Sequence, residues 1–160
     1  MTISDCQTSD NAAGIYFDKS KYLKLENCEI SGCKGEGGNS SGGIDIREPK
    51  GTVLMKDTAI TDCDGKDGGI HIADGSSAFN MSGSTVIKVE PRGKLTDPNK
   101  NDVYLTDHVF IALTGSLFGA EPIARITLNS SGHDGYKDDR EVVKDDSGFT
   151  ITADIKINLQ

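Results

Sequence analysis

Three short patterns of alternating apolar and polar residues recur along the chain at similar intervals. The first usually follows glycine, and its leading apolar residue returns every 26 to 33 residues, at Ile15, Ile44, Ile70 and Val103. The second returns every 26 to 32 residues, at Leu23, Val53, Phe79 and Ile111. The third returns every 27 to 30 residues, at Ile3, Ile30, Ile60 and Ile87. Self-similarity at a shared period is the signature of a repeat architecture.

Each repeat offers three short strands separated by Gly, Asn, Asp and Ser, with no helical periodicity between them. Parallel strands can pair without a crossover helix if the chain coils like a spring, so that each strand lies on its equivalent one turn earlier. The sequence therefore predicts an all-β, right-handed parallel β-helix: a three-sheet solenoid of about four coils with a C-terminal capping strand. Nineteen glycines and no tryptophan also weigh against a helical bundle.

Residues that face the interior of stacked coils should recur as columns. The third pattern is expected to form an isoleucine ladder, and a second ladder beside a tight corner is expected from Cys6, Cys33 and Cys63. Free thiols packing as small apolar side chains are the main interpretation. A disulfide between neighbouring coils stays conceivable, although side chains in a parallel register point the same way. The spacing fits no metal-binding pair, so we expect no metal site and no cofactor.

Alternation also identifies a stripe on the outer face of the sheet formed by the first pattern. Its members are Tyr16, Asp45, His71 and Tyr104. Aromatic and carboxylate side chains on an exposed sheet could bind a sugar, and an Asp–His pair could orient a proton. The stripe is the candidate ligand-binding site, with ordinary cross-strand contact as the alternative interpretation. Two opposite-charge pairs, Asp18 with Arg47 and Glu26 with Lys56, are expected to be structural.

Several motifs carry a resemblance to a known family. "GGIDI" (42–46) and "GGIHI" (68–72), combined with "LENCEISGC" (25–33) and "MKDTAITDC" (55–63), resemble the right-handed parallel β-helix repeats of bacterial surface proteins, including polymorphic outer-membrane and autotransporter-like adhesins with a pectate-lyase-like fold. The resemblance covers roughly residues 1–128. It implies an exported, elongated and non-enzymatic protein, located outside the cell or on the bacterial surface, and its motifs record coil geometry more than activity.

The repeat divides the chain into coils over residues 1–128 and a different segment over residues 129–160. That segment contains a charged run, expected to be an exposed loop, and then "FTITADIKINLQ", which alternates as an amphipathic strand suited to capping or continuing the sheet. Because Met1 falls within a coil, we expect an excerpt of a longer solenoid, with neighbouring coils as partners. A linker strand to another domain is the alternative interpretation of the last segment.

Charge and motif content limit the other functions. The net charge of −8 and the lack of a Lys/Arg cluster exclude nucleic acid as an expected partner, and no apolar run suits membrane insertion by this segment. "DCDGKDGG" (62–69) lacks the ligand pattern of a calcium loop, and "GHDG" (132–135) lies outside the coils. The sequence predicts a non-catalytic stalk or adhesin-like display segment that contacts carbohydrate or a host surface protein. The alternative is a carbohydrate-active or sugar-binding β-helix that uses the outer stripe.

Overall fold

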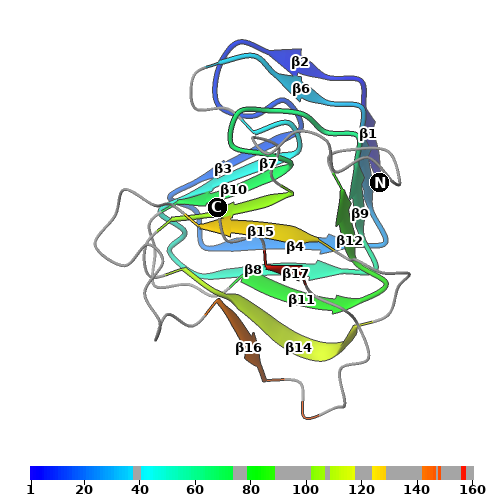
Figure 1. The fold of residues 1–160 in the computed structure, drawn as a ribbon, viewed down its shortest axis with the longest axis vertical. Helices are drawn as coiled ribbons and strands as arrows, with labels where there is room; N and C mark the ends of the chain where they lie inside the picture. Colours follow the sequence, from blue (N-terminus) through cyan, green and yellow to red (C-terminus); the bar gives the residue numbers. More distant parts are fainter. Residues whose placement is uncertain are drawn as a thin grey trace.

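The computed structural model describes residues 1–37, 41–73, 79–88, 102–106, 109–117, 124–128, 142–146, 148 and 156–157. Within these ranges the regular structure consists entirely of β-strands. Three sheets surround a common interior, and a fourth, smaller sheet extends one corner (Figure 1). Every strand pair is parallel.

Neighbouring strands of each sheet come from successive repeats of the chain. In spatial order, the first sheet holds β1 (Thr2–Ser4), β5 (Glu29–Ser31), β9 (Ala59–Thr61) and β12 (Val86–Lys88). The second sheet holds β3 (Ile15–Asp18), β7 (Ile44–Arg47), β10 (Ile70–Ala73), β13 (Val103–Leu105), β15 (Arg125–Leu128) and β17 (Lys156–Ile157). The third holds β4 (Tyr22–Glu26), β8 (Thr52–Lys56), β11 (Phe79–Gly83), β14 (Ile111–Leu117) and β16 (Val143–Asp145). The smallest pairs β2 (Gln7–Thr8) with β6 (Lys34–Gly35).

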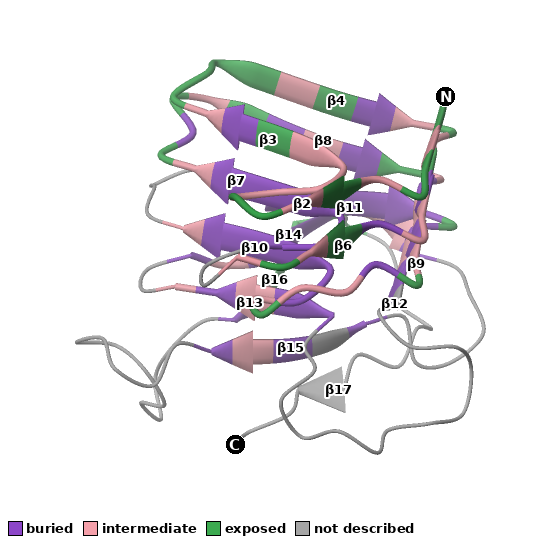
Figure 2. Cartoon of the chain, turned by 90° about the horizontal axis from the view of Figure 1, so that it is seen from above, coloured by how far each residue is buried: buried purple, intermediate pink, exposed green. Residues whose placement is uncertain are grey.

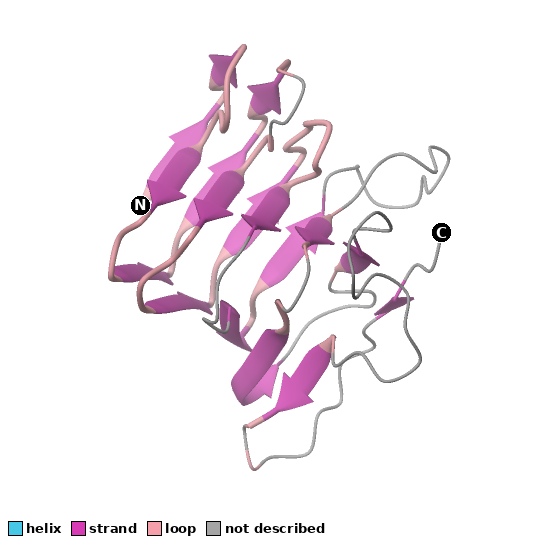
Figure 3. Cartoon of the chain, turned by 90° about the vertical axis from the view of Figure 1, so that its left-hand side faces the viewer, coloured by secondary structure: helices cyan, strands magenta, loops and turns pink. Residues whose placement is uncertain are grey.

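The register of the three large sheets follows the sequence repeat residue for residue. Ile3 pairs with Ile30, Ile30 with Ile60, and Ile60 with Ile87. The other two patterns align in the same way along the second and third sheets. The prediction of an all-β parallel β-helix is confirmed. We call residues 1–27 coil 1, residues 28–57 coil 2 and residues 58–84 coil 3; Figure 3 shows their strands side by side along the axis.

The core is a set of columns inside the three sheets. Ile30, Ile60 and Ile87 are completely buried, as are Cys33 and Cys63. Their equivalents in coil 1, including Cys6, are only partly buried. Figure 2 shows buried and less buried residues alternating along the strands, as a pleated strand with one inward face requires.

Tight corners between the strands use residues in the left-handed backbone region. Asp5, Asn27, Asp57 and Asp62 have φ values of 48° to 53°, which Asn and Asp tolerate better than most side chains. Asp57 also stabilises the corner below it, because its Oδ1 accepts a hydrogen bond from the Ser84 amide at 2.8 Å. These corners let one strand follow another within a coil without a longer loop.

Glycines before the second sheet allow coils to approach closely. A Cβ on Gly43 would come within 2.6 Å of the Gly69 carbonyl oxygen, and a Cβ on Gly14 would collide with the Gly43 carbonyl. The amides of Gly14 and Gly43 donate to the carbonyls of Gly42 and Gly69, so these backbones lie in direct contact. The glycine before each apolar triplet is therefore a packing requirement of the stacked coils.

Pairing with the solenoid continues past residue 128. β16 pairs with β14, and β17 pairs with β15. β16 lies within the charged run that the sequence predicted to be an exposed loop; its Lys144 forms an ion pair with Asp146 at 3.0 Å. Only Lys156–Ile157 of the predicted capping strand is described, and these two residues extend the second sheet. The capping role and the boundary at residue 128 stay predictions, and "GHDG" lies outside the described residues.

Candidate functional site

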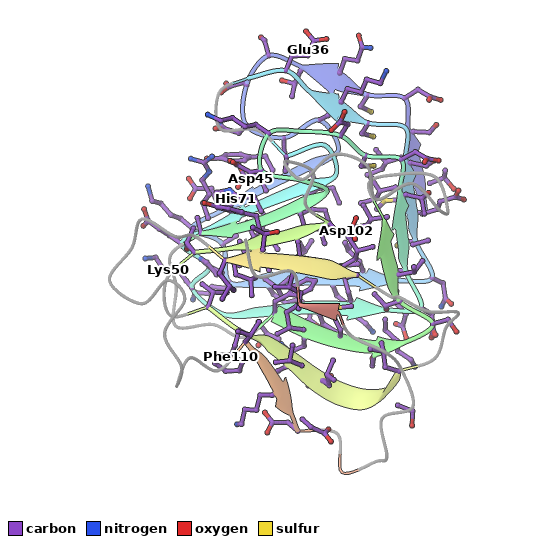
Figure 4. The ribbon with its side chains drawn as sticks, viewed as in Figure 1. Glu36, Asp45, Lys50, His71, Asp102 and Phe110 are labelled. Atoms are coloured by element: carbon purple, nitrogen blue, oxygen red, sulfur yellow. The ribbon has the colours of Figure 1, made fainter. Side chains whose placement is uncertain are left out.

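The predicted stripe lies on the outer face of the second sheet. Tyr16 on β3 pairs with Asp45 on β7, Asp45 pairs with His71 on β10, and His71 pairs with Tyr104 on β13. Each of these residues sits between two inward apolar residues, so the pleat turns its side chain away from the core. The ladder therefore brings the four residues together in their predicted order, and Figure 4 shows Asp45 and His71 close to one another.

Both oxygens of the Asp45 carboxylate are held by cationic or potentially cationic groups. Oδ1 lies 3.0 Å from Nδ1 of His71. Oδ2 accepts a hydrogen bond from Nε of Arg47 at 2.9 Å and lies 2.9 Å from the second guanidinium nitrogen, NH2, of Arg47. The bond to Asp45 raises the pKa of Arg47 above its ordinary value. Such a two-point contact fixes the orientation of both groups.

A second carboxylate lies near the same histidine. Oδ2 of Asp67 lies 4.0 Å from Nδ1 of His71, on the turn that leads into β10. Burial raises the pKa of Asp67, while the neighbouring His71 and Lys66 act against that rise. On the other side, the rings of His71 and Tyr104 are 5.6 Å apart with an interplanar angle of 43°. His71 is thus enclosed by two acids and an aromatic ring.

The expectation that the whole stripe lies on an exposed surface is wrong for its two central residues. Asp45 is completely buried and His71 is only 7% exposed, whereas Tyr16 is 47% exposed. Arg47 contacts Asp45 from two residues along the same strand, and Asp67 approaches His71 from the preceding turn. The outer face of a sheet is therefore covered here by its own neighbouring side chains.

Sequence reasoning did not identify Arg47 and Asp67 as members of this cluster. Arg47 was predicted to pair with Asp18, which is its neighbour in the register, but its guanidinium binds the carboxylate of Asp45. Asp67 was considered only as part of a weak calcium loop. The available signal was spacing: Asp67 precedes His71 by four residues, and Arg47 follows Asp45 by two, which places it on the same face of the strand.

The chemistry of the cluster is that of a closed ion network. Asp45 has no oxygen left over for a substrate proton, because both of its oxygens face nitrogen atoms of Arg47 and His71. His71 directs Nδ1 at Asp45 and lies against Tyr104. A general acid or base needs a hydrogen-bonding path to a substrate, and Asp45 is buried away from solvent. This geometry orients side chains and links three strands.

The other candidate groups are structural in their contacts. The four cysteines are free, and burial raises the pKa of Cys63 to about 12, so its thiol stays protonated at neutral pH. Cys63 donates a weak hydrogen bond to the Ile30 carbonyl at 3.5 Å. Glu26 contacts Lys56 at 3.7 Å, as predicted, and Lys24 at 2.6 Å. Within the described ranges, no group of three or more His, Cys, Asp or Glu residues is arranged to hold a metal ion.

Comparisons with known proteins place this geometry in a family. Searches of curated proteins and of solved structures returned no match. In the described part of the chain, no helix has the length and apolar character needed to cross a membrane. A family profile described as "Right handed beta helix region" matches residues 1–110, which is more than half of the chain. Together with the parallel three-sheet solenoid, this match shows that the chain belongs to the right-handed β-helix family.

Proposed function

We propose that this chain is a non-catalytic segment of a bacterial cell-surface or secreted β-helix protein, serving as a structural stalk or an adhesin-like display surface. The observation that supports this most directly is the closed Asp45 carboxylate, with one oxygen facing His71 and the other facing Arg47. The group best placed for acid–base chemistry is thus used to join strands. A stack of rigid parallel coils is well suited to holding an exposed surface at a distance from an anchor.

A sugar-binding role is the second candidate, and two exposed aromatic side chains favour it. Tyr16 is 47% exposed and Tyr22 is 59% exposed, on neighbouring strands of coil 1. Exposed tyrosine rings offer an apolar face with a polar tip, which suits carbohydrate or a host surface protein. In this alternative the ligand contacts the tyrosines, while Asp45 and His71 support the sheet from within.

The two candidates are separated by a glycan array combined with a polysaccharide-cleavage assay. The variants are Asp45→Ala, His71→Ala and Tyr16→Ala, each checked for an intact fold by circular dichroism and thermal unfolding. We expect no cleavage by the wild type or by any variant. Cleavage by the wild type that is lost in folded Asp45→Ala or His71→Ala would overturn the non-catalytic proposal. Glycan binding lost only in Tyr16→Ala would establish the sugar-binding alternative.

The proposed location has its own test. Antibodies raised against the chain should label intact source cells or the culture medium, and brief protease treatment of intact cells should remove the surface signal. A cytosolic marker serves as the control for cell integrity. A signal that appears only after lysis would contradict the surface or secreted location.

A further inference from the structure

The large apolar side chains that remain exposed lie at one end of the solenoid. Among the described residues these are Met1, Tyr16 and Tyr22, at 64%, 47% and 59% exposure, and all three belong to coil 1. Among the described strands, β1, β3 and β4 are each the last member of their sheet. Figure 2 shows β3 and β4 at one end of the stack and β15 and β17 at the other. Edge strands present backbone groups that can pair with another strand.

Each interior column reports what coverage by one further coil does. Ile30 and Ile44 of coil 2 are completely buried, while Ile3 and Ile15, their equivalents in coil 1, are only partly buried. Val53 is buried and its equivalent Leu23 is only partly buried. The residue types in the two coils are similar, so the difference in burial comes from the coil that lies on coil 2. The same coverage is what coil 1 lacks.

The surface of coil 1 continues an interface that the chain already uses. Coil 2 presents β5, β7 and β8 to coil 1, and coil 1 binds them by parallel, in-register pairing. Coil 1 presents β1, β3 and β4, with equivalent residues in equivalent columns, in the opposite direction along the same axis. A surface that repeats a bound surface can bind a coil of the same kind.

Charges at the corners add a chemical requirement. In the Glu26 column the charge alternates from one coil to the next, with Lys56 lying 3.7 Å from Glu26. Lys19 likewise lies 3.8 Å from Glu48. Asp18 and Arg47 are also register partners. A coil laid on coil 1 would therefore continue this alternation if it carried a basic residue over Asp18, an acidic one over Lys19 and a basic one over Glu26. Coil 2 has that pattern.

We propose that the exposed end of coil 1 is a docking surface for one further coil of this same repeat, bound in parallel and in register, with the corner charges of coil 2. This inference deepens the proposed stalk or display function and rests on it, because it names the partner that would extend the solenoid. The occupant is a β-coil with inward Ile or Val residues over Ile3, Ile15 and Leu23.

The test adds such a coil to the complete chain. Residues 28–57 are fused directly before residue 1, which places the added Arg47, Glu48 and Lys56 over the corner residues of coil 1. The added copy carries D57N, because the Asp57 carboxylate lies where a Cβ at Gly83 would collide, and Asn is the residue that ends coil 1. We expect a monomer by light scattering. We also expect backbone amides of β1, β3 and β4 to exchange with deuterium at least about tenfold more slowly than in the original chain.

The matched control is the same fusion with R47E, E48K and K56E in the added coil only, which sets like charges over coil 1. Smaller protection in this control than in the first fusion supports the charge requirement, and equal protection overturns it. No protection in either fusion overturns the docking surface. A concentration-dependent dimer of the original chain that protects the same strands would also overturn the proposal, since the surface would then belong to a second copy. None of these outcomes depends on the glycan and cleavage results.

Discussion

Asp45 shows how a single carboxylate can be buried on the outside of a sheet. Its negative charge is removed from solvent but faces the guanidinium of Arg47 and the ring of His71. Removing water from a charge costs several kcal/mol unless partners replace it, so these contacts are a condition for the burial. Because His71 lies on the next coil, the network connects two levels of the solenoid as well as neighbouring residues of one strand.

Asp67 provides a pH-dependent prediction at the same scale. Its pKa is raised in the folded protein, so ionisation at neutral pH opposes folding, and this effect disappears as the pH falls through the raised pKa. Asp67→Asn should therefore increase the free energy of unfolding at neutral pH, with a gain that shrinks in acid. Urea titrations from neutral pH to about pH 4 measure this difference.

Asp10→Asn, at an exposed position, is the control and should change stability by less than about 0.5 kcal/mol. If Asp67→Asn is instead less stable than the wild type at neutral pH, the contact of Asp67 with His71 outweighs the cost of its burial.

The sequence could place the residues of this cluster but not their burial. Period-2 alternation assigns Asp45 and His71 to the outer face, since Ile44, Ile46 and Ile70 must face inward. Alternation says nothing about what lies over an outer face. Cover by Arg47 depends on the rotamer of a long side chain, and approach by Asp67 depends on the path of a turn. Neither follows from strand periodicity.

The isoleucine column of the first sheet allows a prediction at the scale of elements. Ile60 on β9 is completely buried between coils, whereas Ile3 on β1 occupies the same column at the exposed end. Ile60→Ala should lower the free energy of unfolding by about 2–5 kcal/mol, because it removes buried methyl groups and leaves a cavity. Ile3→Ala should cost clearly less. Chemical denaturation of both variants measures the two values, and equal costs would mean that the end of coil 1 is covered.

Strands were predictable where they combine alternation with repetition. The three patterns identified the inward residues of the three large sheets, because a narrow interior accepts similar residues at every level. The pair of β2 and β6 was missed, since strands of two residues show no periodicity. β16 was missed because Lys144 and Asp145 sit in a charged run, where composition indicates a loop. Backbone pairing, which any side chain can accompany, places these strands.

The two ends of the whole molecule lead to the last prediction. Residues 149–160 contain β17, which pairs with the outer edge of β15. Deleting this segment should expose that edge and promote association, because unpaired strand edges template further pairing. Size-exclusion chromatography with light scattering should show oligomers that grow with concentration. An unchanged monomer would count against a cap at this end.

Stacking in a single file also determines how the protein would respond to a mechanical load. Each strand of the three large sheets pairs only with its equivalents one level away, so no strand pairing ties distant levels together among the described residues. A pull on the two ends of the chain would peel off terminal levels one after another while the middle stayed folded. Each level holds 27 to 30 residues, judging by the spacing of the isoleucines, and would release slack of about 90–100 Å at ~3.4 Å per residue. A tether built this way lengthens in steps under tension and can rewind when the tension is removed.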